Sequence, residues 1–233
     1  MISFKDTITP LGHVFLVRHG QASFGADDYD QLSALGKQQS IRLGEYWRER
    51  GMAFEAVLIG SLKRHRQTWE GIQLGLQDNR LQALVWPGLN EYDSEAVIHC
   101  IHPAPLAKPN TPELYKHHFG LLRKGLQEWM HGRTQPTGMP TFKEFVQGIS
   151  DALAHVRSQH EGNVLVVSSG GPISTAVGSL LGTPPESMIE MNMRIRNTAV
   201  SECVYNPKRT TLVSFNTINH LDADAYRDWV TFT

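Results

Sequence analysis

Two arginines and a histidine follow short apolar runs of the chain. Arg18 and His19 follow the run at 13–17, and Arg64 lies a few residues beyond the run at 55–60. Guanidinium groups suit the bidentate recognition of phosphate oxygens, and an imidazole beside them adds a further hydrogen-bonding group. If the ends of these runs meet in the fold, the three side chains would flank an anion the size of phosphate.

A third apolar run ends in serines and glycines, in the stretch VLVVSSGGPIS at 164–174. The paired glycines Gly170 and Gly171 would let the backbone approach a ligand closely, and the Ser169 hydroxyl could donate a hydrogen bond to it. A tight turn between a strand and a helix would explain the same letters, and Ser169 could also be a nucleophile. Taken alone, the stretch leaves these alternatives open.

The stretch SLKRHRQT at 61–68 carries its own indication of an anion. We expect Ser61 to cap a helix that runs to about 74, which places Lys63, Arg64 and Arg66 in its first turns. Cations there oppose the helix dipole by about 0.3–1 kcal/mol each, whereas a bound anion would attract both the backbone N–H groups and the guanidinium. A solvated basic turn is the alternative interpretation.

The elements that must position these residues alternate between strands and helices. This alternation predicts an α/β fold with a doubly wound, mostly parallel sheet flanked by helices on both faces, in which ligands bind beyond the carboxyl ends of the strands. A single domain over 1–233 is expected. The strands are expected at 13–17, 55–60, 81–86 and 163–167, with a hairpin at 198–206 and 210–216. The helices are expected from Ser33 to Gly51, from Ser61 to about 74, at 112–131, after a Thr141/Glu144 capping box and from about 170 to 181, with a loop at 88–110.

Composition narrows the classes of partner. The net charge is −1, from 22 Lys+Arg against 23 Asp+Glu, so neither a nucleic acid nor an anionic membrane surface is indicated as partner. Two distant cysteines are no disulfide framework, no apolar window is long enough to span a membrane, and the first residues do not resemble a signal peptide. We therefore expect a cytoplasmic protein that binds phosphate or a small phosphorylated substrate, and a homodimer is left open.

Four blocks of the sequence resemble those of a known family, the histidine phosphatase superfamily of phosphoglycerate-mutase-like proteins. The four blocks are FLVRHGQ, SLKRHRQT, LNE and VLVVSSGGPI. The resemblance covers roughly residues 12–221. It implies a phosphoglycerate-mutase-like fold, in which approximately 88–140 would form a lid or insertion region. It also implies a phosphatase that hydrolyses a phosphate monoester through a phosphohistidine, with no cofactor and no metal.

The resemblance also assigns roles to residues of this chain. His19 would be the nucleophile that takes the phosphoryl group, Arg18 and Arg64 would clamp the phosphate, and Glu91 would be the general acid and base. Burial or a bound dianion would have to raise the pKa of Glu91 for that task. The remaining phosphate-binding positions would be Gln21, Ser23, Ser169 and Gly170.

Two departures from the family pattern matter. The spacing of Ser61 and Arg64 is one residue shorter than usual. More important, Ser169 stands where the family carries a second histidine. A serine brings a hydrogen bond but no charge, and losing one preorganised donor costs about 2.7–4 kcal/mol in a transition state. A weakly active or silent phosphate-ester-binding protein is therefore the alternative function, and a phosphomutase is a further one.

Parts of the sequence are also compatible with two other classes of site. A serine hydrolase with Ser169 as nucleophile would need a G-x-S-x-G elbow, but Val167 stands at its first glycine position. A metal site could draw on the histidines of HCIH at 99–102 together with His117 and His118, although no matching set of cysteines or carboxylates accompanies them.

Overall fold

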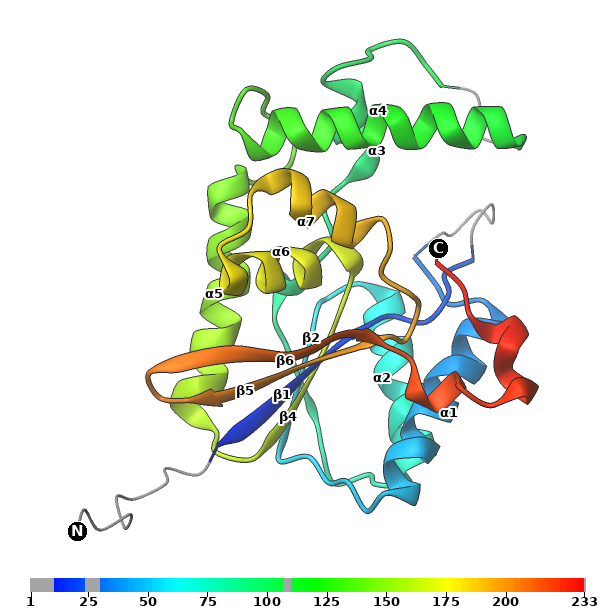
Figure 1. The fold of residues 1–233 in the computed structure, drawn as a ribbon, viewed down its shortest axis with the longest axis vertical. Helices are drawn as coiled ribbons and strands as arrows, with labels where there is room; N and C mark the ends of the chain where they lie inside the picture. Colours follow the sequence, from blue (N-terminus) through cyan, green and yellow to red (C-terminus); the bar gives the residue numbers. More distant parts are fainter. Residues whose placement is uncertain (1–10, 24–29, 107–109, 233) are drawn as a thin grey trace, which may run out of the picture.

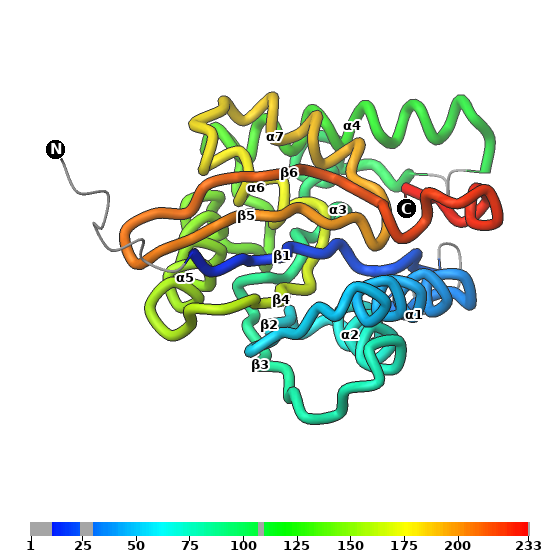
Figure 2. Tube along the Cα trace, turned by 60° about the horizontal axis from the view of Figure 1, so that its bottom comes forward, coloured from blue at the N-terminus to red at the C-terminus, as the bar shows by residue number. Residues whose placement is uncertain are grey.

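The computed structural model describes residues 11–23, 30–106 and 110–232. Within them the strands are β1 (Gly12–Arg18), β2 (Ala56–Ile59), β3 (Ala83–Val85), β4 (Asn163–Ser168), β5 (Val200–Asn206) and β6 (Arg209–Thr217). They form a six-stranded sheet in the order β3-β2-β4-β1-β5-β6. Figure 2 shows the strands side by side in this order.

The sheet is mostly parallel, as the apolar runs predict. β1 pairs with β4, β4 with β2 and β2 with β3 in parallel, whereas β5 and β6 add an antiparallel hairpin at one side. The three runs that precede the polar clusters are therefore neighbours, in the order β2, β4, β1. Their carboxyl ends meet at one edge of the sheet.

Helices cover both faces of the sheet (Figure 1). α1 (Ala34–Glu49) and α2 (Lys63–Leu76) pack on one face, and α5 (Phe142–Gln159) and α6 (Gly170–Leu181) on the other. Beyond α5 and α6 lie α3 (Ser94–His99), α4 (Pro112–Met130) and α7 (Pro185–Asn192). The caps expected at two helix starts are present: Ser33 accepts the Gly36 N–H, and Thr141 and Glu144 form a capping box.

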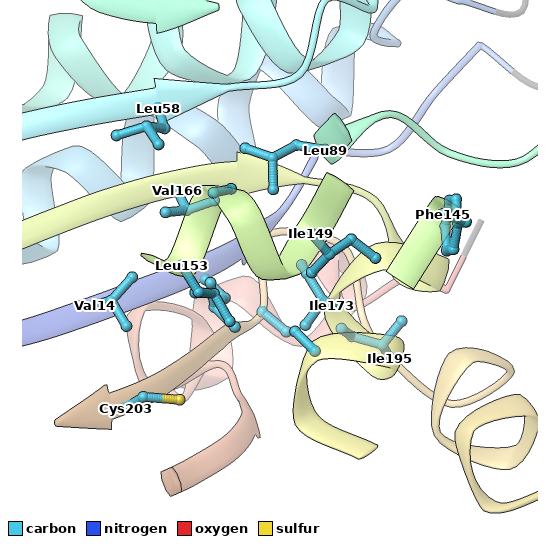
Figure 3. Packing of buried hydrophobic residues seen from close by; sticks show 14 of the residues in the cluster. Val14, Leu58, Leu89, Phe145, Ile149, Leu153, Val166, Ile173, Ile195 and Cys203 are labelled. Carbon is cyan, nitrogen blue, oxygen red and sulfur yellow. The ribbon is translucent and has the colours of Figure 1, made fainter. Parts of the chain in front are cut away.

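Alternate side chains of the central strands supply two cores. Phe15 and Val17 of β1 point to α1 and α2, where Leu43, Trp47 and Ile72 are buried. Val14 and Leu16 point the other way, into the larger cluster shown in Figure 3. That cluster includes Leu58, Leu89, Phe145, Ile149, Leu153, Val166, Ile173, Ile195 and Cys203. Burial on both faces fixes the register of β1 and β4, because a slip by one residue would exchange the two sets.

Several local expectations are wrong. The stretch expected as a loop at 88–110 contains the short helix α3, capped by Asp93, whose carboxylate accepts the N–H groups of Glu95 and Ala96. Ser61 does not cap α2, because the cap position is Leu62 and the Ser61 backbone and hydroxyl bond the Asn90 side chain instead. The hairpin strand begins at Val200 rather than at 198.

The chain continues past the sheet in short 3-10 turns, at Asn219–Leu221 and Asp224–Trp229. They bring residues 229–232 back to the edge of the sheet where β1 ends, as the red segment of Figure 1 shows. No helix in the described residues has the length and apolarity to cross a membrane.

Candidate active site

The pairing of β1 with β4 brings two of the polar clusters together. Arg18 lies opposite Ser168 in the parallel ladder, and the His19 N–H donates to the Ser168 carbonyl at 2.9 Å. The third cluster joins them through α2, because the Gly20 N–H donates to the Thr68 hydroxyl at 3.0 Å. The ends of β1 and β4 and the start of α2 thus form one site.

His19 is almost fully buried and held in one tautomer. Its Nδ1 lies 2.7 Å from the carbonyl oxygen of Gly20, which can only accept, so Nδ1 carries the proton and Nε2 carries the lone pair. Burial lowers the pKa of His19 well below its usual value, and the neighbouring charges of Arg18 and Arg64 lower it further. The imidazole is therefore neutral at physiological pH, as an attacking group must be.

The backbone around His19 is secured by a strained residue. Thr198 has φ of +53°, a region that β-branched residues rarely adopt, and its N–H lies 3.1 and 3.3 Å from the carbonyl oxygens of Arg18 and His19. Asn197 donates from its side chain to the His19 carbonyl at 3.2 Å. The Thr198 hydroxyl donates to the Asn197 carbonyl and accepts from Nε2 of the buried His220 at 2.9 Å. Strain of this kind is held only where the surroundings fix the chain, which is common at functional sites.

The two arginines approach His19 from different elements. Arg18, at the end of β1, donates from Nη1 to the carbonyls of Ile195 and Phe232 at 2.6 and 2.8 Å. Arg64, in the first turn of α2, donates from Nη1 to Asp30 at 2.8 Å, and the same carboxylate accepts the Lys63 N–H at 2.9 Å. The anionic group at the start of α2 is thus the side chain of Asp30, and the bound anion that the basic first turn predicts stays a prediction.

Glu91 reaches the site from the turn after β3. Its Oε2 accepts the Gly171 N–H at 3.1 Å, at the start of α6. An added Cβ at Gly171 would lie 2.2 Å from Glu91 Oε1 and 2.6 Å from the Tyr92 ring, so a larger residue would displace these side chains. Burial raises the pKa of the Glu91 carboxyl, although hydrogen bonds from Gly171 and Tyr92 and the charges of Arg64 and Arg18 oppose the rise.

Ser169 pairs with a histidine that sequence reasoning missed. Ser169 occupies the cap position of α6, and its hydroxyl oxygen lies 2.7 Å from Nε2 of His65, which follows Arg64 in α2. Both side chains are fully buried, and the rings of His65 and His19 have centroids 5.9 Å apart. His65 belongs to the stretch SLKRHRQT, but its partner Ser169 lies 104 positions further along the chain. The one hint was the departure from the family pattern at Ser169.

The other predicted phosphate-binding residues are placed less directly. Gln21 lies one residue beyond Gly20, but its side-chain oxygen accepts from the Ser33 hydroxyl at 2.8 Å. Ser23 lies further out, where its N–H donates to the Gln31 carbonyl. Gly170 is buried as the first residue of α6, between β4 and Asn192. The site residues brought together are thus Arg18, His19, Arg64, Glu91 and Ser169, and their roles as ligands stay predictions.

The alternative metal site finds no ligand set in the described part of the chain. There, no three or more histidine, cysteine or carboxylate side chains come together in a way that could hold an ion. The rings of His102 and His117 do approach, with centroids 6.3 Å apart, but they do so alone.

The expected lid region contributes one wall near Glu91. Tyr92 and Trp129 line a narrow apolar pocket together with Gly171 and Asn192, and the Asn192 side chain donates to the Tyr92 hydroxyl at 2.8 Å. Trp129 belongs to helix α4, which packs against α3 and α7.

Comparisons with known proteins agree with this arrangement. The sequence model of the histidine phosphatase superfamily (branch 1) matches residues 14–218. The adenosylcobalamin/alpha-ribazole phosphatase of Escherichia coli is 27% identical over 220 residues, which cover 87% of this chain and 95% of that protein. Among solved structures, the alpha-ribazole phosphatase of Shigella flexneri matches with a TM-score of 0.63 at 25% identity, over 88% of this chain and 96% of that one. A phosphoglycerate mutase of Bacillus anthracis shares the fold, with a TM-score of 0.64 at 18% identity over 91% and 96% of the two chains.

Proposed function

Because the chain belongs to the histidine phosphatase superfamily, we propose that it hydrolyses a phosphate monoester through a phosphohistidine formed on His19. The observation that carries the proposal is the state of that imidazole. His19 is buried, neutral and fixed with its lone pair on Nε2, and the charges of Arg18 and Arg64 act both on it and on the Glu91 carboxyl, whose pKa burial raises. A positioned neutral nucleophile, a cationic clamp and a protonated acid are what transfer of a phosphoryl group requires.

In the first step, Nε2 of His19 attacks phosphorus in line with the leaving oxygen. The P–N bond forms as the P–O bond to the leaving group breaks, and the Glu91 carboxyl protonates that oxygen. Arg18 and Arg64 neutralise the charge on the equatorial oxygens, which is the main contribution a protein can make to this transfer. For Arg64 to bind phosphate in this way, its contact with Asp30 must be shared or exchanged.

In the second step, water replaces histidine. The Glu91 carboxylate takes a proton from water, whose oxygen attacks phosphorus and breaks the P–N bond. Inorganic phosphate leaves, and Glu91 and His19 return to their starting states. Each step uses groups of this chain, so added metal is not expected to be needed.

The relatives indicate which esters to test first. Because the Escherichia coli relative that spans most of the chain is an alpha-ribazole phosphatase, alpha-ribazole phosphate belongs in the panel, together with phosphoserine, glycerol phosphate and p-nitrophenyl phosphate. The panel should be run with and without a chelator. Metal-independent release of phosphate from at least one ester is the expected result.

The intermediate itself provides the decisive test. Rapid quenching during turnover should yield an acid-labile, base-stable phosphoprotein that ³¹P NMR identifies as a phosphoramidate. His19→Ala should abolish both turnover and this species, whereas His117→Ala, at an exposed position on α4, should change neither. A wild-type protein that binds phosphate but turns over no ester would instead favour the silent phosphate-ester binder.

A further inference from the structure

We propose that His65 is a positioning residue that aims the hydroxyl proton of Ser169 at a phosphoryl oxygen above His19. The proposal deepens the phosphatase function given above and rests on it for the identity of the ligand. It concerns a pair of side chains, one from α2 and one from the start of α6, that acts as a single hydrogen-bond donor.

The pair lies in the wall of the site. Ser169 directly follows Ser168, whose carbonyl accepts the His19 N–H, so the ends of β1 and β4 hold His19 and Ser169 side by side. His65 stands next to Arg64 on α2, with its ring 5.9 Å from that of His19. A phosphoryl group on His19 Nε2, clamped by Arg64, would therefore lie within the reach of this wall.

Ser169 does not perform the task that serine usually has at this position. A serine at the first position before a helix normally turns its oxygen back onto an N–H of the first turn. In α6 the Ser169 side chain makes no such bond, and the Gly171 N–H is given to Glu91 instead. The hydroxyl oxygen lies 2.7 Å from His65 Nε2, and this is its one hydrogen bond among the described residues.

The surroundings of His65 indicate the direction of this hydrogen bond. Its Nδ1 is buried and has no hydrogen-bond partner in the described part of the chain. It faces the Cα of Gly60, where an added Cβ would lie only 2.2 Å away, so a Gly60 C–H points at it. A C–H group is a weak donor and not an acceptor, and buried N–H groups without an acceptor are rarer than unmatched acceptors. These facts favour a lone pair on Nδ1 and a proton on Nε2.

The consequence for Ser169 follows from counting protons. If Nε2–H donates to the Ser169 oxygen, the hydroxyl proton is not used within the pair and can be donated to a ligand. Burial and the charge of Arg64 lower the pKa of His65 to about 3, so the ring stays uncharged at neutral pH. His65 thus fixes the orientation of a neutral donor and adds no charge of its own.

The opposite tautomer would give the pair another role. With the proton on Nδ1, Nε2 would accept the Ser169 proton, as a general base does beside a serine nucleophile. That arrangement would direct a buried N–H at the Gly60 Cα, and among the described residues it would lack the carboxylate that normally orients such a base. The two roles are therefore distinguished by the position of one proton.

NMR of ¹⁵N-histidine-labelled protein reads that proton without any need for turnover. Long-range ¹H–¹⁵N correlations distinguish the two tautomers, and the His65 signals are identified by their loss in His65→Gln. A proton on Nε2 at neutral pH, in the free protein and with inorganic phosphate, is the expected result. A proton on Nδ1 would overturn the proposal and support Ser169 as a nucleophile.

Turnover of variants tests the coupling of the pair. Ser169→Ala should lower kcat about 10²-fold, the effect of losing one preorganised donor, and His65→Leu should lower it at least about tenfold because the hydroxyl is no longer aimed. The double variant should be no slower than Ser169→Ala, since His65 acts through the hydroxyl. His65→Gln, whose amide N–H can replace Nε2–H, should restore most of the rate. Losses that multiply in the double variant, or a His65→Leu protein as active as wild type, would overturn the proposal.

Binding of inorganic phosphate separates this proposal from the phosphatase function. Calorimetry should show the same pattern in the dissociation constants: weaker binding in Ser169→Ala and His65→Leu, no further weakening in the double variant, and recovery in His65→Gln. If wild type binds phosphate in this pattern without turning over any ester, the phosphatase function fails and the role of the pair stands. If the protein turns over an ester but neither phosphate affinity nor kcat changes in the variants of the two residues, the pair is structural. The proposal for the pair then fails, while the phosphatase function stands.

Discussion

Replacing Gly171 with alanine should displace Glu91, the proposed general acid, without a change in the Glu91 residue itself. A Cβ at this position would lie 2.2 Å from Glu91 Oε1 and 2.6 Å from Cε1 of Tyr92, whereas real Cβ contacts are essentially never shorter than 3.0 Å. Glu91 must therefore retreat by about 1 Å, a misplacement that costs roughly 10²-fold in rate. This loss corresponds to about 2.7 kcal/mol of transition-state stabilisation.

The identity of the leaving group makes the assay specific. An alkyl phosphate such as glycerol phosphate needs a proton on its leaving oxygen, whereas p-nitrophenolate leaves without one. The ratio kcat/KM reports the steps up to departure of the leaving group, so it should fall about 10²-fold for the alkyl ester and change little for the aryl ester. Glu91→Gln should show the same selectivity.

Gly120→Ala is the matched control for this variant. It is also a glycine-to-alanine change within a helix, but no heavy atom lies within 4 Å of its added Cβ. Its kinetics should equal those of wild type. If Gly171→Ala slows both esters equally, or neither, the assignment of Glu91 as the acid that acts from the start of α6 is refuted.

Two predictions concern pH. Burial raises the pKa of Glu91 and lowers that of His19, so kcat/KM for an alkyl ester should fall as pH rises through the Glu91 pKa, with no loss from His19 protonation near 6.5. Glu91→Gln should abolish this fall in kcat/KM at higher pH. If the pH profile of Glu91→Gln equals that of wild type, the assignment of Glu91 as the acid is wrong. Burial also lowers the pKa of His220 from 6.5 to about 3, so the unfolded chain binds a proton between these values that the folded chain does not, and stability must decrease as pH falls through 6.5. By pH 5 the contribution of His220 to this decrease in the free energy of unfolding is about 2 kcal/mol. Urea unfolding at pH 7 and at pH 5 measures the decrease. His220→Gln should remove the contribution of about 2 kcal/mol, whereas the control His117→Gln should not.

The sequence predicts those parts of the site that depend on local patterns. Apolar runs identify β1, β2 and β4, and parallel pairing then requires their polar ends to meet. The Ser33 cap and the Thr141/Glu144 capping box also depend on residues three apart, so the sequence is sufficient for them.

The parts that sequence reasoning missed depend on distant contacts or on competition between near neighbours. The sequence predicts that Ser61 caps α2, but Ser61 forms hydrogen bonds with the side chain of Asn90, which lies 29 positions away. Asp93 is a residue type that often caps helices, and it does cap α3. Because prolines follow so short a helix, the sequence pattern there is typical of a loop. The contact of His65 with Ser169 spans 104 positions and that of Gln39 with the Trp229 carbonyl spans 190, and no periodicity carries such information.

The place of β1 in the sheet has a consequence for how the protein folds. His19 directly follows β1, and both partners of this strand, β4 and β5, come from beyond residue 162. Until that part of the chain has been synthesised, β1 has neither of its neighbours, so both of its edges present unpaired backbone groups and apolar side chains. Contacts so far apart in sequence form slowly and leave the nascent chain open to aggregation. The proposed binding of phosphate should therefore appear late in refolding, together with the last cooperative step rather than before it.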